Sequence, residues 1–255
     1  MTIASEISRQ ISNLKSDLVS ILLDWVFMSF TFVILIVLFE VSTSFQYDDV
    51  SKLQLMVGYF IWRIAGGVIV ETVQSIAIES KHGTLEQIIL TGERLINVLF
   101  ARGSFYTVSY TIRLLILGLF ILPFLQTDST YFGFNLVLIV ILTILGVIGF
   151  ALILCGVHLV TKAPSNLAFT ISTALLLLSG AVSSNQGNFW LYQIGRVLPL
   201  GIGIELIKNY METKLIDLNN IAALVTSTLV YIGLGVLAVY FAEKFAKRKG
   251  NLSQY

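Results

Sequence analysis

The sequence predicts an all-α integral membrane protein. Of its 255 residues, 56% are hydrophobic and only 12% are charged. The apolar residues gather in runs longer than eighteen residues, close to the length that a helix needs to cross the ~30 Å hydrocarbon core of a bilayer. The formal net charge is +1, and no basic stripe alternates with aromatic residues, so a nucleic-acid partner is not expected.

An amphipathic helix is predicted over residues 1–20, ahead of the first apolar run. Isoleucine and leucine recur there at spacings of three and four, with charged residues between them. Such a helix can lie in the headgroup plane of the membrane, or it can pack on the rest of the chain as an ordinary cytoplasmic helix. We favour the interfacial location. Residues 21–255 are predicted to form one transmembrane domain.

Six membrane-spanning helices are predicted in that domain, each about as long as the hydrocarbon core requires. Pro164 suits the first position of the fifth helix, where a missing N–H costs nothing. The predicted spans are residues 21–40, 53–78, 105–125, 132–160, 164–182 and 221–242.

Residues 188–210 form a further apolar stretch, which we interpret as two short helices broken in the middle. The stretch contains Arg196, Pro199 and Glu205. With six spans and a cytoplasmic N-terminus, ten of the 16 Lys and Arg residues fall on the inner side and four on the outer side. A seventh span would move the basic tail KFAKRKG outside, against the positive-inside rule. We therefore predict a broken or re-entrant outer hairpin at residues 183–215, and both termini in the cytoplasm.

A short polar segment separates the second and third spans. Gly83 interrupts the second span, and Thr84 and Gln87 have the spacing of a capping box. Glu86 lies in the first turn of the helix that follows, where the helix dipole favours it. The predicted helix, residues 85–91, is marginal alone, so its own membrane base or a partner must hold it.

The segment ESKHGTLEQIILT closely resembles the ABC-2 family of ABC-transporter permeases. That family has an acidic residue, then Gly-Thr-Leu-Glu-Gln, an apolar pair, and a Thr or Ser before a turn. Gly92 stands where many members have Pro. Residues 178–180 and 197–208 resemble a later segment of the family more weakly. The matching residues are Glu79, Gly83, Thr84, Leu85, Glu86 and Gln87.

The resemblance covers nearly the whole chain and implies the permease subunit of an exporter in the cell membrane. In that family the short helix is the coupling helix, which seats in a groove of a separate ATP-binding subunit. The resemblance thus assigns coupling to residues 79–95. It also implies two ATP-binding subunits, which use ATP and Mg, and a second permease copy, identical or similar. From spacing alone, a surface helix that merely closes a loop is equally consistent.

Three charged residues fall inside predicted spans: Arg63 and Glu71 in the second and Arg113 in the third. A charge at such depth costs a few kcal/mol, so it usually faces a partner or a cavity. Glu71 is too far from Arg63 to pair with it but can approach Arg113. These residues either form an ion pair that fixes helix packing, which we favour, or line a translocation path. Asp24 and Glu40, near the ends of the first span, are expected to reach water and to need no role.

No enzymatic chemistry is predicted for this chain. It contains no Walker-type phosphate-binding loop and no convincing catalytic set. His82 and His158 lack companions at metal-ligand spacing, and the single cysteine, Cys155, is expected to be a buried thiol. One alternative function is an ATP-independent secondary transporter or channel, which predicts inverted repeats. Another is a membrane-bound enzyme, which needs clustered catalytic residues.

Overall fold

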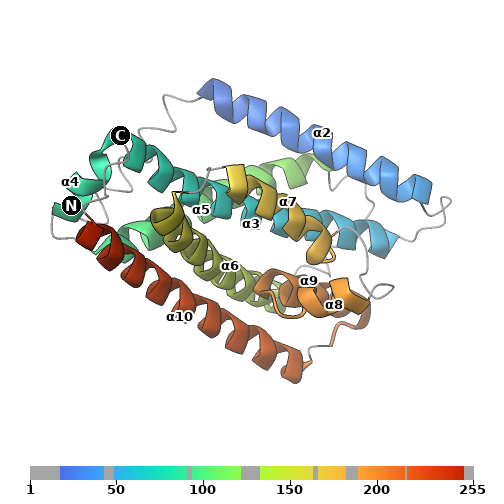
Figure 1. Cartoon of the computed structure of the whole chain (residues 1–255). Helices are drawn as coiled ribbons and strands as arrows, with labels where there is room; N and C mark the ends of the chain where they lie inside the picture. The colour runs from blue at the N-terminus through green and yellow to red at the C-terminus, as the bar shows by residue number, and fades with distance from the viewer. Residues whose placement is uncertain are drawn as a thin grey trace.

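The predicted all-α class is confirmed for the described part of the chain, in which no strand occurs (Figure 1). The computed structural model describes residues 18–42, 49–90, 94–121, 133–162, 166–181, 189–215 and 217–249. Most of the predicted amphipathic helix, Pro164 and Gly92 lie outside these ranges. The helices are α2 (Leu18–Ser42), α3 (Asp49–His82), α4 (Thr84–Leu90), α5 (Leu95–Ile121), α6 (Phe134–Thr161), α7 (Asn166–Leu178), α8 (Phe189–Gly195), α9 (Pro199–Thr213) and α10 (Leu218–Lys249).

Within the described ranges, four helices are long and apolar enough to cross a membrane: α2, α3, α6 and α10. They coincide with the first, second, fourth and sixth predicted spans. α5 has 27 residues and covers most of the third span, but Arg102 and Arg113 lower its hydropathy. α7 has 13 residues, or about 20 Å at 1.5 Å per residue. The chain is therefore a helical membrane protein, and its number of crossings is taken up under the proposed function.

α3 forms the centre of the bundle and packs against α5, α6, α7 and α9. Its buried side chains include Tyr59, Val68 and Ile69, all 0% exposed. α6 and α10 approach most closely, because a Cβ added at Gly149 would lie 2.6 Å from the backbone nitrogen of Ile232. α2 and α10 expose long rows of apolar side chains, as helices that face lipid do.

Residues 188–210 contain two short helices, as predicted from the sequence. α8 and α9 are separated by a turn, and Pro199 begins α9 after an extended Leu198. The left-handed Lys214, with φ 55°, ends α9. Figure 1 shows α8 and α9 at one end of the bundle, and α4 with the C-terminal end of α10 at the other.

Lys208 joins α9 to α7 and α3 at the α8–α9 end of the bundle. Its Nζ donates a hydrogen bond to the Gly180 carbonyl oxygen at 2.5 Å, just beyond α7. Gln54 of α3 donates to the Lys208 carbonyl oxygen at 3.2 Å and to the Glu212 carboxylate at 3.0 Å. Burial lowers the pKa of Lys208 to about 8, and the Glu212 carboxylate opposes part of this shift.

We expect Lys208 to make the folded protein more stable as the pH rises from about 8 towards the ordinary lysine pKa of ~10.4. In this window the unfolded chain keeps a proton that the folded chain has lost, so stability increases with pH. At lower pH both states are protonated, and the cost of burying the charge is complete. Thermal unfolding in detergent should therefore show a flatter pH profile for Lys208→Met than for the wild type. Parallel profiles would contradict the assignment.

Candidate functional site

α4 is a helix of 7 residues set between the ends of α3 and α5. Gly83 has a φ of 68°, so the chain turns through a left-handed residue between α3 and α4. This confirms the predicted break at that position. Leu85 and Ile88 are buried, whereas Gln87 is exposed and Leu90 is 83% exposed. α4 therefore rests on the protein along one face and presents the other face outwards.

The predicted capping box at the start of α4 is wrong. Thr84 is the first residue of the helix rather than the residue before it. The Thr84 hydroxyl donates a hydrogen bond to the Glu79 carbonyl oxygen at 3.3 Å. Because Gly83 makes the reversal immediately before Thr84, this side chain reaches back to the carboxyl end of α3. Glu86 does lie in the first turn of α4, as expected.

A buried ion pair joins the two long helices that flank α4. Arg102 of α5 donates from Nη2 to Oε1 of Glu79 on α3 at 2.6 Å, and the two side chains are 1% and 10% exposed. The resemblance assigned Glu79 to coupling, but the sequence reasoning counted Arg102 only as one inner charge. Its neighbours gave a signal, because Leu99 and Leu95, three and seven residues earlier, lie on the buried face of α5. The pair fixes the separation of α3 and α5 where α4 emerges.

Gly83 can be tested by substitution, because no atom lies within 4 Å of a Cβ added there. The cost of a side chain should therefore come from the left-handed backbone alone, about 1–2 kcal/mol for an ordinary residue. Asparagine tolerates this conformation better than a β-branched residue does. We expect Gly83→Val to lower the Tm in detergent by several degrees and Gly83→Asn to retain most of it. Equal Tm values for the two variants would show that the turn does not need a left-handed residue.

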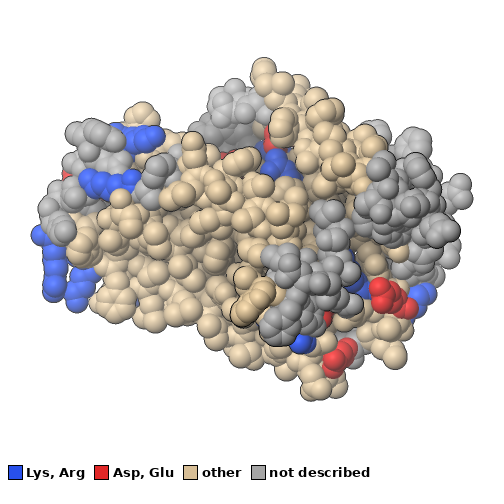
Figure 2. All heavy atoms as spheres, turned by 45° about the vertical axis from the view of Figure 1, so that its right-hand side comes forward, with Lys and Arg blue, Asp and Glu red and all other residues tan. Residues whose placement is uncertain are grey.

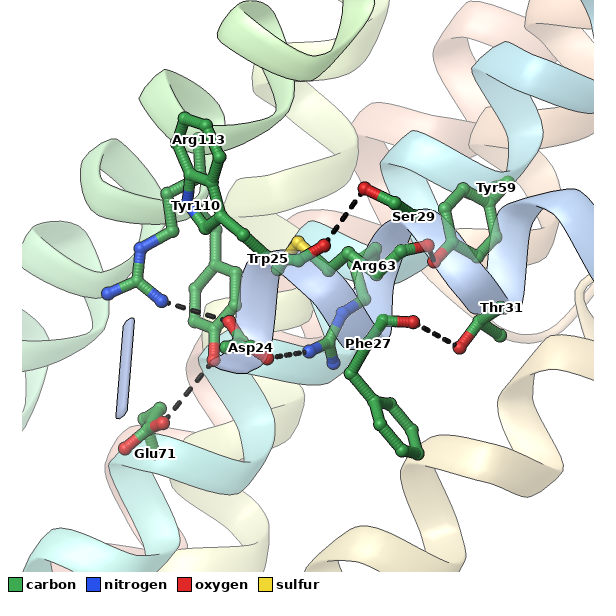
Figure 3. Close-up of polar contacts among 11 residues, drawn as sticks. Asp24, Trp25, Phe27, Ser29, Thr31, Tyr59, Arg63, Glu71, Tyr110 and Arg113 are labelled. Carbon is green, nitrogen blue, oxygen red and sulfur yellow. Dashed lines mark hydrogen bonds and ion pairs between the residues drawn. The ribbon is translucent and has the colours of Figure 1, made fainter. Parts of the chain in front are cut away.

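A second group of polar residues, which we call the charge cluster, joins α2, α3 and α5 (Figure 3). Arg63 donates to one carboxylate oxygen of Asp24 at 2.5 Å, and Arg113 donates to the other at 3.0 Å. Both guanidinium groups lie over the ring of Tyr110, at 5.6 and 5.1 Å from its centroid. The Tyr110 hydroxyl donates to Glu71 at 3.3 Å. One carboxylate thus bridges two cations from neighbouring helices.

The charge cluster corrects two expectations. Asp24 was expected to need no role, yet it is the acidic partner of both arginines. Glu71 was expected to approach Arg113 as its partner, but its direct hydrogen bond comes from Tyr110. The reason is the offset between α2 and α3: Tyr59 donates to the Met28 carbonyl oxygen at 3.0 Å, which sets the beginning of α2 beside the middle of α3.

The charge cluster can hold three helices together, and it is partly accessible. Its charged side chains at the bridge are 15–24% exposed, so they can also contact a polar molecule that passes beside α2. Its residues do not form a nucleophile–base pair. Among the residues that the structure describes, no three His, Cys, Asp or Glu side chains gather where they could hold a metal ion.

Comparison of the sequence with protein-family models and with curated proteins gives no match. The functional interpretation therefore depends on the resemblance at Glu79–Gln87 and on the geometry of two places. These are α4 with its buried ion pair and the charge cluster.

Proposed function

We propose that this chain is the permease subunit of an ABC exporter in the cell membrane, with α4 as its coupling helix. The observation that carries the proposal is the mounting of α4. This short helix is attached through Gly83 to a long, buried membrane helix. The Glu79–Arg102 pair fixes the two flanking helices to each other. In this proposal ATP and Mg are used by the partner subunit, not by this chain.

The mounting of α4 suits the transmission of movement. A helix of 7 residues is too short to be stable alone, but Leu85 and Ile88 bury one of its faces. Force applied to the exposed face is then passed to α3 and α5 rather than lost in a flexible loop. Leu90, which the sequence reasoning did not single out, presents an apolar side chain on the exposed face. It suits a contact in an apolar groove of an ATP-binding subunit.

The charge distribution supports a cytoplasmic location for α4. Figure 2 shows basic side chains at the end of the molecule that carries α4 and the C-terminal end of α10, while acidic and basic side chains mix at the opposite end. Under the positive-inside rule the more basic end is cytoplasmic. We accordingly propose six crossings, with α5 and α7 completing the set, and a translocation path between two permease copies. The basic residues of the α4 end are Lys81, Arg94, Lys162, Lys244, Lys247 and Arg248.

Site-directed cross-linking tests this proposal. The only cysteine, Cys155, is buried, so Cys155→Ser gives a background for Gln87→Cys and Leu90→Cys. A photo-activated cross-linker on either cysteine should capture an ATP-binding subunit in native membranes. Lys247→Cys is the matched control at the same end of the bundle. Capture from none of the α4 positions would favour an ATP-independent transporter or channel, and equal capture from all three would indicate chance contact.

Glu86→Lys should uncouple the complex while leaving the permease folded. Glu86 is only partly buried and has no ion pair with another described residue, so folding does not depend on its charge. Reversing that charge alters the part of α4 that faces the proposed groove and opposes the helix dipole. The ATP hydrolysis rate of the purified complex should lose its dependence on the permease, whereas Glu86→Gln should retain most of it. Unchanged hydrolysis and transport in Glu86→Lys would remove Glu86 from the coupling role.

A further inference from the structure

α6 and α10 enclose an open groove near the end of the bundle that carries α4. Its volume is about 610 Å³, and most of its lining is apolar. Its floor is narrow because a Cβ on Gly156 would lie 2.8 Å from the Ala238 carbonyl carbon. Its walls carry bulky side chains that are 41–60% exposed: Val157 and Val160 from α6, and Phe241 and Phe245 from α10.

Two cations line the same groove at its outer end along α10. Lys244 and Arg248 are both exposed, and neither has an acidic partner among the described residues. They are four residues apart, so they lie on one side of the helix, where like charges repel each other. Lys247 is different: it pairs with Glu243 at 2.5 Å and does not line the groove. The groove therefore has a net positive charge that no described residue balances.

We propose that this groove binds one anionic phospholipid, with an acyl chain along the apolar walls and the phosphate between Lys244 and Arg248. The inference does not depend on the proposed transport function, because it requires only that α6 and α10 lie in a membrane. Both are among the helices long and apolar enough to do so. A bound phosphate would balance the two cations and remove their repulsion.

The dimensions and the polarity of the groove match such a lipid. From Ala238 to Arg248 the helix rises about 15 Å, with the apolar lining first and the cations at the end. A lipid has the same order, from acyl chain to headgroup, and basic sites between membrane helices at the cytoplasmic side are known to hold anionic headgroups. A soluble anion would leave Phe241 and Phe245 uncovered, so it explains only the charged end of the groove.

Native mass spectrometry of the full chain in detergent tests this inference. Phosphatidylglycerol and phosphatidylcholine of the same acyl chains are titrated separately. We expect phosphatidylglycerol to bind several-fold more tightly, and Lys244→Gln/Arg248→Gln to remove that preference. Lys247→Gln, which changes charge on the same helix outside the groove, should retain it. Val160→Trp fills the groove without removing charge and should weaken the binding of both lipids.

Four outcomes would overturn the inference. These are equal binding of the two lipids by the wild type, an equal loss of preference in Lys247→Gln, unaltered binding by Val160→Trp, and displacement of the lipid by inorganic phosphate. If the groove variants change the mass of a dimer and leave lipid adducts unaltered, the groove is an interface between two copies instead.

Discussion

Arg102→Met should prevent most of the protein from reaching its folded state. The substitution leaves the Glu79 carboxylate, 10% exposed, without the guanidinium that lies 2.6 Å away. Removing one member of a buried ion pair typically costs about 3–5 kcal/mol, which is a large part of the ~5–15 kcal/mol that stabilises a native protein. Fluorescence-detected size-exclusion chromatography of the tagged variant should show little monodisperse protein and a Tm lowered by several degrees.

The double variant Glu79→Leu/Arg102→Met is the matched control. Replacing both charges with apolar side chains removes the unpaired carboxylate and is often neutral for stability. We expect the double variant to recover much of the yield that Arg102→Met loses. If Arg102→Met has the wild-type Tm, the pair does not hold α3 and α5 together, and the proposed mounting of α4 loses its base.

Asp24→Asn should have the second-largest effect, because one carboxylate serves two guanidinium groups. The variant leaves Arg63 and Arg113 facing each other across Tyr110 without the anion between them. The loss should approach the ~3–5 kcal/mol of a broken buried pair, although the partial exposure of these side chains places it at the lower end. Glu71→Gln should cost less, because an amide oxygen can still accept the hydrogen bond from Tyr110.

Yield and transport together separate the two interpretations of the charge cluster. Arg113→Ala should lower the yield of folded protein if the cluster fixes helix packing. A normal yield and Tm with failed transport would instead place these side chains on the translocation path. Asp24→Asn/Arg113→Gln, which removes one charge of each sign, should be more stable than Asp24→Asn. If it is not, the bridge contributes little to folding.

The helices and their breaks could be predicted because they depend on local patterns. The apolar runs identified α2, α3, α6 and α10, Gly83 located the turn before α4, and Pro199 located the start of α9. These features follow from hydropathy, left-handed backbone and missing N–H groups at single positions. They need no knowledge of which helices are neighbours.

The partners of the charged residues could not be predicted, because they depend on how far one helix is displaced along another. Asp24 reaches Arg63 only because α2 begins beside the middle of α3. Arg102 is buried because α5 turns that side towards Glu79. A sequence gives the depth of a residue along its own helix, but helix offset and rotation come from packing. The capping box failed for a related reason, since one left-handed residue decided which helix end Thr84 would serve.

The most direct measurement is the composition of the complex that the tagged chain forms in native membranes, purified in mild detergent and identified by mass spectrometry. The proposed function predicts an ATP-binding subunit in equal amount to the permease, retained in Glu86→Gln and lost in Glu86→Lys and Leu90→Asp. A wild-type chain that emerges folded and stable without any ATP-binding subunit would contradict the permease proposal. In that case α4 would be a helix that closes a loop.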